Sequence, residues 1–423
     1  MRASATLALL LASLGVASFA ETAESATTNS WTVYHGNVAG TGVATGLASV
    51  STQSPRWISP SLNGELYGEP LVEGNAIYVA TETNYVYALS SSTGHVLWSH
   101  QVAPPVPSSA LPCGDIVPDV GITGTPVIEP ARHELFVLAD EMLSGHPHHV
   151  LVGLDLANGA LKLRRDVDPA GSDPAALLQR TGLTLDRGRI VFAMGGNYGD
   201  CASYRGSVIS VAESGANQET FTVDNRPGDS QGAIWMGGAA PVVDSSGNVW
   251  VSTGNGSVHS GGQAYDDSDG VLELSASMHL AQYFAPSDWP ANNAADLDMS
   301  TAPVLLGTSQ VLLAGKSALP TFLTRGTSGE LVTTRLRSLC ATPTSTVAAR
   351  RSARRCSCPV RVDSWRCAWA RALGYACCGE RQRVLDPPST RPDSSGPLDK
   401  MASSTGSVPV AVRSTKARTS VTS

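Results

Sequence analysis

The stretch Gly68–Trp98, "GEPLVEGNAIYVATETNYVYALSSSTGHVLW", decides the fold. Its short apolar runs, "AIYVA" and "YVYALS", are rich in β-branched and aromatic residues, which favour strands. Gly and Asn separate these runs, and a Thr-Gly pair precedes the last run, "VLW", as in the tight turns between neighbouring strands. The stretch therefore predicts four short antiparallel strands.

Blocks of the same form recur along the first three-quarters of the chain. Their openers are Pro70, Pro126, Leu183, Pro241 and Pro303, which are separated by 56, 57, 58 and 62 residues. Turn-bounded strands at this period are typical of β-propellers, in which each four-stranded blade packs on its neighbours. The alternative is a β-sandwich of irregular hairpins, and the regular spacing favours the propeller. We expect an all-β chain with about five blades and an incomplete ring, because the pattern stops after Ser317.

The N-terminus has the pattern of an export signal. Arg2 is followed by the apolar run Leu7–Ala17 and by "SFA", which ends in a small residue before Glu21. We therefore predict a signal peptide over residues 1–20, a linker over 21–30, and a secreted or extracytoplasmic protein. The apolar run is too short to span a bilayer comfortably, and no later segment is apolar enough, so we expect no membrane span.

The last hundred residues differ in composition from the rest. The chain has a net charge of −7, yet from Leu319 onward Lys and Arg number 17 against 6 Asp and Glu. Five of the eight cysteines lie between Arg350 and Arg383, but their spacing does not give two C-x-x-C zinc knuckles. A nucleic-acid-binding arm ranks lowest, because an exported protein has little use for one, so we expect no nucleic-acid partner.

Two interpretations of residues 318–423 stay open, a native basic tail and a shift of the reading frame. The codons allowed for Ala318–Glu330, regrouped by one base, permit "AYLLDAGHLGG", which restores a strand and a Gly-rich turn. The frameshift is favoured, because composition and periodicity change together at this point. We predict that this basic, Cys- and Arg-rich segment is disordered.

The repeat resembles that of a known family. The motif in Tyr85–Trp98, which ends in T-G-x-x-x-W, resembles the pyrroloquinoline quinone (PQQ)-type repeat, and the opener Trp31–Gly42 is similar to the segment that begins such domains. This repeat builds the propellers of quinoprotein alcohol dehydrogenases and of non-enzymatic relatives. The resemblance covers residues 31–317 and implies a PQQ-like β-propeller there, but it does not by itself imply chemistry.

The resemblance to the dehydrogenases implies two site residues in Ala233–Ser257. Trp235 matches a tryptophan that stacks on PQQ, and Asn255, in a T-G-N turn, matches a Ca²⁺ ligand. The alternatives are a blade-packing aromatic for Trp235 and a left-handed turn residue for Asn255. PQQ and Ca²⁺ are the cofactors that these matches imply.

Other places in the resemblance match less well. Asp200 is the carboxylate nearest to the place of a Ca²⁺-ligating Glu. Asp288 is a substitute for the catalytic Asp, because Pro290 stands directly after Trp289 where the family has that residue. The dehydrogenases of the family also carry two adjacent cysteines near the second blade. The corresponding region of this chain, Pro112–Pro126, has Cys113 as its one cysteine.

Two further features have open interpretations. A disulfide between Cys113 and Cys201 is a candidate in an exported protein, since these are the cysteines of the repeat region. "HPHH" (His146–His149) is either a metal site or a solvated hairpin loop, and the lack of carboxylates nearby in sequence favours the loop. "YDDSDG" (Tyr265–Gly270) is a solvated turn or a cation site without the Glu of an EF-hand.

Two functions follow from these observations. The first is an exported PQQ-like-repeat propeller that acts as a binding or scaffold module for an unknown protein or small-molecule partner. The alternative is a PQQ- and calcium-dependent alcohol dehydrogenase, impaired by truncation. The sequence names no substrate.

Overall fold

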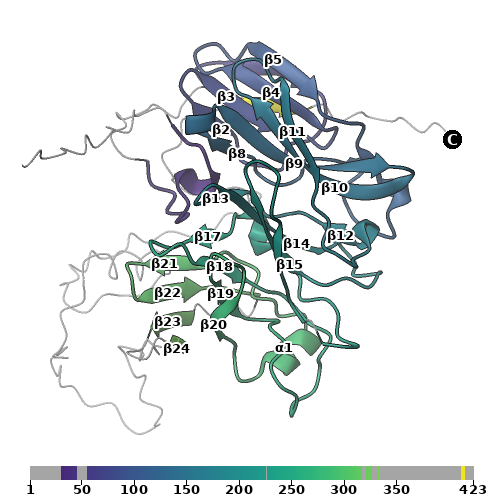
Figure 1. Cartoon of the computed structure of the whole chain (residues 1–423), viewed down its shortest axis with the longest axis vertical. Helices are drawn as coiled ribbons and strands as arrows, with labels where there is room; N and C mark the ends of the chain where they lie inside the picture. Colours follow the sequence, from purple (N-terminus) through teal and green to yellow (C-terminus); the bar gives the residue numbers. More distant parts are fainter. Residues whose placement is uncertain are drawn as a thin grey trace, which may run out of the picture.

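The computed structural model describes residues 30–44, 55–224, 226–316, 321–325, 331–333 and 411–414. Five antiparallel sheets, four of them four-stranded and the third five-stranded, follow one another along the chain and form an open arc (Figure 1). Each predicted opener stands immediately before the first strand of a sheet, so the sequence period is the blade period. The predicted all-β propeller with about five visible blades and an unclosed ring is confirmed.

Each blade is a simple up-and-down meander in which consecutive strands are paired. Blade one is β2 (Leu71–Glu73), β3 (Ala76–Ala80), β4 (Tyr85–Ser90) and β5 (Val96–Gln101). Blade two is β8 (Val127–Glu129), β9 (Glu134–Leu143), β10 (His146–Asp155) and β11 (Leu161–Asp166). Blade three is β13 (Thr184–Asp186), β14 (Arg189–Gly196), β15 (Ser207–Ala212) and β16 (Glu219–Thr222), and β12 (Leu177–Leu178) also pairs with β14.

Blades four and five have the same order. Blade four is β17 (Val242–Val243), β18 (Val249–Ser252), β19 (Val271–Leu274) and β20 (Leu280–Phe284). Blade five is β21 (Val304–Leu306), β22 (Gln310–Leu313), β23 (Thr321–Arg325) and β24 (Leu331–Thr333). Its last two strands lie beyond Ser317, so the repeat continues past the predicted boundary. The rest of 318–423, apart from β25 (Ala411–Ser414), lies outside the described residues, as does the predicted signal peptide.

The middle strands of the blades are buried on both faces. All five residues of β3 and all four of β18 are buried, whereas the outermost strands β5 and β11 are largely exposed. Separate apolar clusters join blades one and two, two and three, three and four, and four and five. Each sheet therefore buries its faces on its neighbours, which is why the middle strands are continuously apolar and do not alternate.

The T-G-x-x-x-W motif is a contact between blades. The ring of Trp98 in β5 packs on Gly159 of blade two, where an added Cβ would lie 2.7 Å from the ring. The indole N–H of Trp98 donates to the carbonyl of Leu156, at 2.9 Å. In blade two Leu163 takes the place of the tryptophan and packs on Gly215 of blade three in the same way. Each glycine is thus a platform for the outer strand of the preceding blade.

The segment Trp31–Gly42, which we call the strap, runs across the blades (Figure 1, purple). It includes the short 3-10 turn η1 (Tyr34–Gly36), and Val33 is buried in the cluster between blades two and three. Its backbone hydrogen-bonds to the first strands of blades one, two and four, through the pairs Trp31–Val72, Thr32–Ile128 and Val38–Val243.

The remaining elements are short. They are β1 (Ile58–Leu62), which pairs in parallel with β25, β6 (Val106–Pro107) paired with β7 (Asp119–Val120), the 3-10 turns η2 (Ser108–Ala110), η3 (Pro130–Arg132), η4 (Pro174–Ala176) and η5 (Met236–Gly238), and α1 (Trp289–Ala294). In the part of the chain that the structure describes, no helix has the length and apolar character needed to cross a membrane.

Candidate functional site

Polar residues follow the second strand of four blades at equivalent places. They are Glu82 after β3, Asn197 after β14, Asn255 after β18 and Lys316 after β22. Since the blades share one topology, these loops lie at the same end of each sheet, where propellers commonly carry their functional residues. The blade four and five members meet in one group of side chains.

This group, the Asn255 cluster, consists of Asn255, Asp296, Asp298 and Lys316. The backbone N–H of Asn255 donates to Asp298 Oδ1 at 2.7 Å, and its side-chain Nδ2 donates to Asp296 Oδ1 at 2.7 Å. Lys316 Nζ lies 2.7 Å from Asp296 Oδ1 and 2.6 Å from Asp298 Oδ2. Three separate segments of the chain thus converge, namely the T-G-N turn, the stretch after α1 and the end of β22.

The two carboxylates of the cluster have different surroundings. The Asp298 side chain is 1% exposed, whereas that of Asp296 is 73% exposed. Hydrogen bonding to Lys316 lowers the pKa of Asp296, so this accessible carboxylate is ionised at neutral pH. Burial alone would lower the pKa of Lys316, but its bonds to both aspartates outweigh burial and raise it.

A buried amide oxygen in the cluster has no hydrogen-bond partner. Asn255 Oδ1 is inaccessible to water and unpartnered among the described residues. An unsatisfied buried acceptor costs about 1–3 kcal/mol, so such an atom requires an explanation. Asn255 Oδ1 and the carboxylate oxygens of Asp296 and Asp298 are oxygen ligands of the kind that hard cations prefer. The chemistry of these donors therefore fits a divalent cation in place of the Lys316 ammonium.

Trp235 lies in the segment next to the T-G-N turn. The carbonyl of Ala233 accepts a hydrogen bond from the N–H of Gly254 at 2.7 Å, which ties the two segments together. Trp235 is half-buried, and its indole N–H donates to the carbonyl of Gly196 at 3.2 Å. The ring packs against the core between blades two and three, so blade packing accounts for its position.

Asp200 and Asp288 lie outside the Asn255 cluster. Asp200 is exposed, and its Oδ1 accepts a hydrogen bond from the hydroxyl of Tyr204, with 2.7 Å between the two oxygens. Asp288 is exposed just before α1, and its side chain does not cap the helix. The predicted disulfide between Cys113 and Cys201 is confirmed, and it links the segment after blade one to the loop after β14.

A second buried acid occupies the equivalent loop of blade one. Glu82 is 3% exposed, and its Oε2 accepts hydrogen bonds from the N–H of Gly121 (2.7 Å) and the hydroxyl of Thr123 (3.1 Å). Burial raises the pKa of Glu82 to about 7, against the effect of these bonds. This carboxyl therefore titrates near neutral pH.

Sequence reasoning missed Asp296, Asp298 and Lys316. The sequence predicts the catalytic carboxylate beside Trp289. In the structure Trp289–Ala294 form α1, and the acidic pair of the cluster follows this helix in "DLD" (Asp296–Asp298). The signal that could have located Lys316 is its place directly after a second strand, equivalent to that of Asn255.

Comparisons with known proteins place this geometry in a family. A model of the family described as "Outer membrane protein assembly factor BamB" matches residues 22–251. Polyvinylalcohol dehydrogenase of Pseudomonas sp. is 25% identical over 229 residues, which is 50% of this chain and 33% of that protein. The chain therefore spans about a third of the length of this curated relative.

Two solved structures share the fold. Quinohemoprotein alcohol dehydrogenase from Comamonas testosteroni superposes with a TM-score of 0.51 at 15% identity, covering 72% of this chain and 52% of that one. A europium-containing methanol dehydrogenase gives a TM-score of 0.50 at 14% identity, covering 72% and 58%. At these identities the likeness shows the propeller alone, but the family match covers more than half of the chain. The chain therefore belongs to the family of PQQ-repeat propellers described as outer membrane protein assembly factor BamB.

Proposed function

We propose that the Asn255 cluster binds a metal cation together with a quinone cofactor of the PQQ class, and that the chain forms the cofactor-binding sheets of an alcohol dehydrogenase. One observation carries the proposal. Four polar side chains from three segments bond to one another in the Asn255 cluster, and one of their atoms, Asn255 Oδ1, is buried and unpartnered among the described residues. The curated relative named as a polyvinylalcohol dehydrogenase supports the same class of reaction.

Each residue of the cluster has a role in this proposal. Asn255 Oδ1 and the buried Asp298 would hold the cation, and Asp296, accessible and ionised, would accept the proton of a substrate hydroxyl. Lys316, displaced from the carboxylates by the cation, would pair with the anionic oxygens of the cofactor. The quinone, when bound, accepts the two electrons of alcohol oxidation.

A binding or scaffold module is the second candidate, and Lys316 favours it. The ammonium already pairs with both Asp296 and Asp298, so the cluster can serve as an ion-pair network that joins blades four and five. Asp200 and Trp235 also support it, since each already has a hydrogen-bond partner within the chain. In this case the propeller would present its surface to a protein or small molecule without catalysis.

Lanthanide luminescence distinguishes these two functions before any turnover is measured. The full chain is titrated with Eu³⁺, with N255A and D298N as test variants and D288N, at an exposed site, as the control. We expect one cation bound by the wild type and by D288N, with affinity at least tenfold weaker in both test variants. Dye-linked alcohol oxidation with PQQ and Ca²⁺ is then measured on the same proteins and on D296N.

The two readouts test cation binding and alcohol oxidation separately. Equal Eu³⁺ affinity in all variants would refute the cation site and leave the scaffold function. Cation binding that depends on Asn255, without PQQ-dependent oxidation by the wild type, would refute the dehydrogenase and keep only a cation-binding module.

A further inference from the structure

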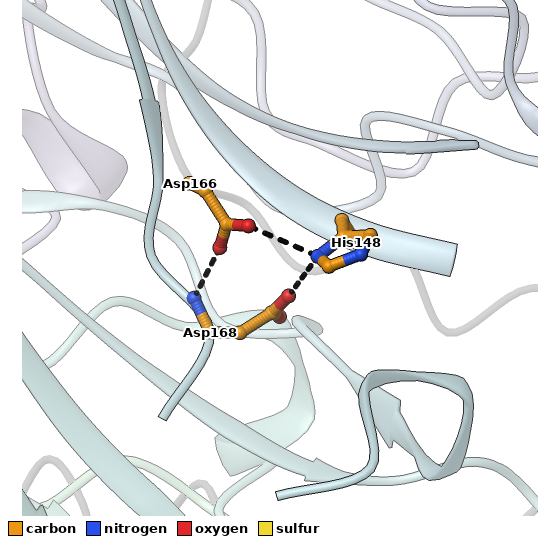
Figure 2. A group of neighbouring side chains, drawn as sticks. All are labelled: His148, Asp166 and Asp168. Atoms are coloured by element: carbon orange, nitrogen blue, oxygen red, sulfur yellow. Dashed lines mark hydrogen bonds and ion pairs between the residues drawn. The ribbon is translucent and has the colours of Figure 1, made fainter. Parts of the chain in front are cut away.

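A second group of ligand-type side chains lies on blade two, away from the Asn255 cluster (Figure 2). His148 on β10 faces two carboxylates from the end of β11 and the residues after it, Asp166 and Asp168. His148 Nδ1 lies 3.0 Å from Asp166 Oδ2 and 2.8 Å from Asp168 Oδ2. The sequence motif "HPHH" lacked carboxylates nearby in the chain, and the pairing of β10 with β11 supplies them.

Both carboxylates are held so that one oxygen of each points at His148. Asp166 Oδ1 accepts the backbone N–H of Asp168 at 3.1 Å, which leaves its Oδ2 toward the imidazole. Asp168 Oδ1 lies 2.7 Å from His149 Nδ1 and 3.3 Å from the backbone nitrogen of His149, which leaves Asp168 Oδ2 toward the imidazole. The orientation of the two carboxylates is thus fixed by bonds on their other oxygens.

His149 gives an independent reason to regard the group as a ligand site. Its side chain is 2% exposed, and its ring nitrogens face two carboxylates, with Nδ1 2.7 Å from Asp168 Oδ1 and Nε2 3.5 Å from Asp140 Oδ1. Carboxylates that ligate metal ions are themselves hydrogen-bonded on their other oxygen, and His149 holds Asp168 in this way. A solvated hairpin loop needs no such support.

We propose that His148, Asp166 and Asp168 bind one divalent transition-metal ion of the zinc class. The three ligand atoms lie within 4.8 Å of one another. Metal–ligand bonds of about 2.1 Å in a tetrahedron put ligand atoms roughly 3.4 Å apart, so small side-chain movements open the group around an ion. An imidazole nitrogen favours zinc-like ions over calcium, which prefers oxygen ligands alone.

The site is accessible to an ion and keeps room for water. The side chains of His148 and Asp166 are 28% and 46% exposed, while Asp168 is 11% exposed. Three protein ligands leave the fourth tetrahedral position open. A bound ion would fix the segment after β11 onto β10, and this inference does not depend on the Asn255 cluster.

Calorimetric titration with Zn²⁺ tests the proposal on the full chain, free of any affinity tag. Metal is first removed with a chelator, and free thiols are alkylated so that the other cysteines cannot bind the probe. The test variants are H148A and D166N, and H95A replaces an exposed histidine in the last turn of blade one as the control. We expect about one Zn²⁺ per chain in the wild type and H95A, and at least tenfold weaker binding in each test variant.

Three results would overturn the inference. These are the absence of stoichiometric Zn²⁺ binding, unchanged affinity in both test variants, and binding of Ca²⁺ that is tighter than that of Zn²⁺ and is weakened by H148A. Circular dichroism of the metal-free variants checks that they fold. D166N alters an exposed carboxylate, so it remains informative if H148A fails to fold.

Discussion

Lys316 holds the Asn255 cluster together in the absence of a cation. Its ammonium lies within ion-pair distance of Asp296 and Asp298, so the chain itself compensates one of the two negative charges. Any metal ion must therefore displace a positive charge, and the affinity of the cluster for cations is set by this competition.

Replacing Lys316 by methionine is therefore expected to increase cation affinity. K316M keeps a long, unbranched side chain but removes the charge that pairs with the two carboxylates, so Eu³⁺ should bind at least tenfold more tightly. The cation-free protein should lose about 1 kcal/mol of stability, since the ion pairs are partly exposed. Luminescence titration and chemical denaturation measure both effects. K162M, which removes an ion pair with Asp155 on blade two, is the control, and equal Eu³⁺ affinities in K316M and wild type would contradict the prediction.

Glu82 predicts how stability changes with pH. Its pKa is raised to about 7 in the folded protein from 4.5, so the folded state binds the proton more tightly than the unfolded state. Its contribution to stability is complete below pH 4.5 and is lost as pH rises toward 7, by at most about 3 kcal/mol.

The variant E82Q should remove this part of the pH dependence. Denaturation at several pH values should show a smaller fall in the free energy of unfolding between pH 4.5 and pH 7 than in wild type. D115N, at an exposed carboxylate, should leave the wild-type slope unchanged. A slope in E82Q equal to that of wild type would show that Glu82 is ionised throughout this range.

At the scale of single elements, a glycine in the outer hairpin of blades one, two and three packs against a side chain from the preceding part of the chain. Gly94 has φ +74°, and a Cβ there would lie 2.3 Å from the ring of Trp57, whose N–H donates to Ser91 at 2.9 Å. The same contact recurs between Gly159 and Trp98. The turn is thus both a left-handed bend and a docking surface.

The matched pair G94A and G74A separates these two roles. Gly74 also has a positive φ, +58°, but a Cβ there meets nothing within 4 Å. G74A should cost only the backbone term, about 1 kcal/mol, whereas G94A should cost at least about 1 kcal/mol more because Trp57 must move. Chemical denaturation of both variants measures the difference. Equal losses would show that the tryptophan contact contributes nothing.

The sequence predicts blades better than the site, for a physical reason. Blade openers, turn glycines and the T-G-x-x-x-W motif act over a few residues, so their pattern is visible in the chain. Asn255 was found because its T-G-N turn is local, but the partners Asp296 and Lys316 come from other loops, and only the packing of blade four on blade five brings them together. The His148 group was missed for the same reason, since its carboxylates lie 18 and 20 residues away.

The repeat beyond Ser317 and α1 show a further limit. Strands β23 and β24 extend blade five although the sequence there has no clear alternation, since pairing with β22 determines strand structure more than composition does. The six-residue helix α1 is too short to show a helical period. Its formation moves the acidic pair away from the place beside Trp289 that the sequence indicates.

At the scale of the whole molecule, the strap connects blades that are not all consecutive along the chain. It bonds to blades one, two and four and buries Val33, which is 4% exposed. Contacts of this kind add to the nearest-neighbour packing of a repeat protein and make the blades unfold together.

Truncating Val33 should therefore destabilise the entire arc. V33A should lower the free energy of unfolding by about 2 kcal/mol, with all blades still unfolding in one transition. V43A, which truncates a valine that is 63% exposed just after the strap, should have an effect below about 0.5 kcal/mol. Denaturation followed by tryptophan fluorescence and by circular dichroism measures both variants. Similar small losses in the two would mean that the strap does not stabilise the blades.

The strap also determines the order in which the chain can fold. Val38 bonds to Val243, about two hundred residues later, so part of the strap has no partner until blade four has been synthesised. Sequence separations of this size slow folding, because the loop between the partners must be closed before the contact forms. Blades one to three can assemble as each is completed, but the strap makes all of its backbone hydrogen bonds only after blade four has been synthesised. The segment made before all the blades is thus among the last to reach its native contacts, and until then the inner strands that it covers are open to proteases and to other chains.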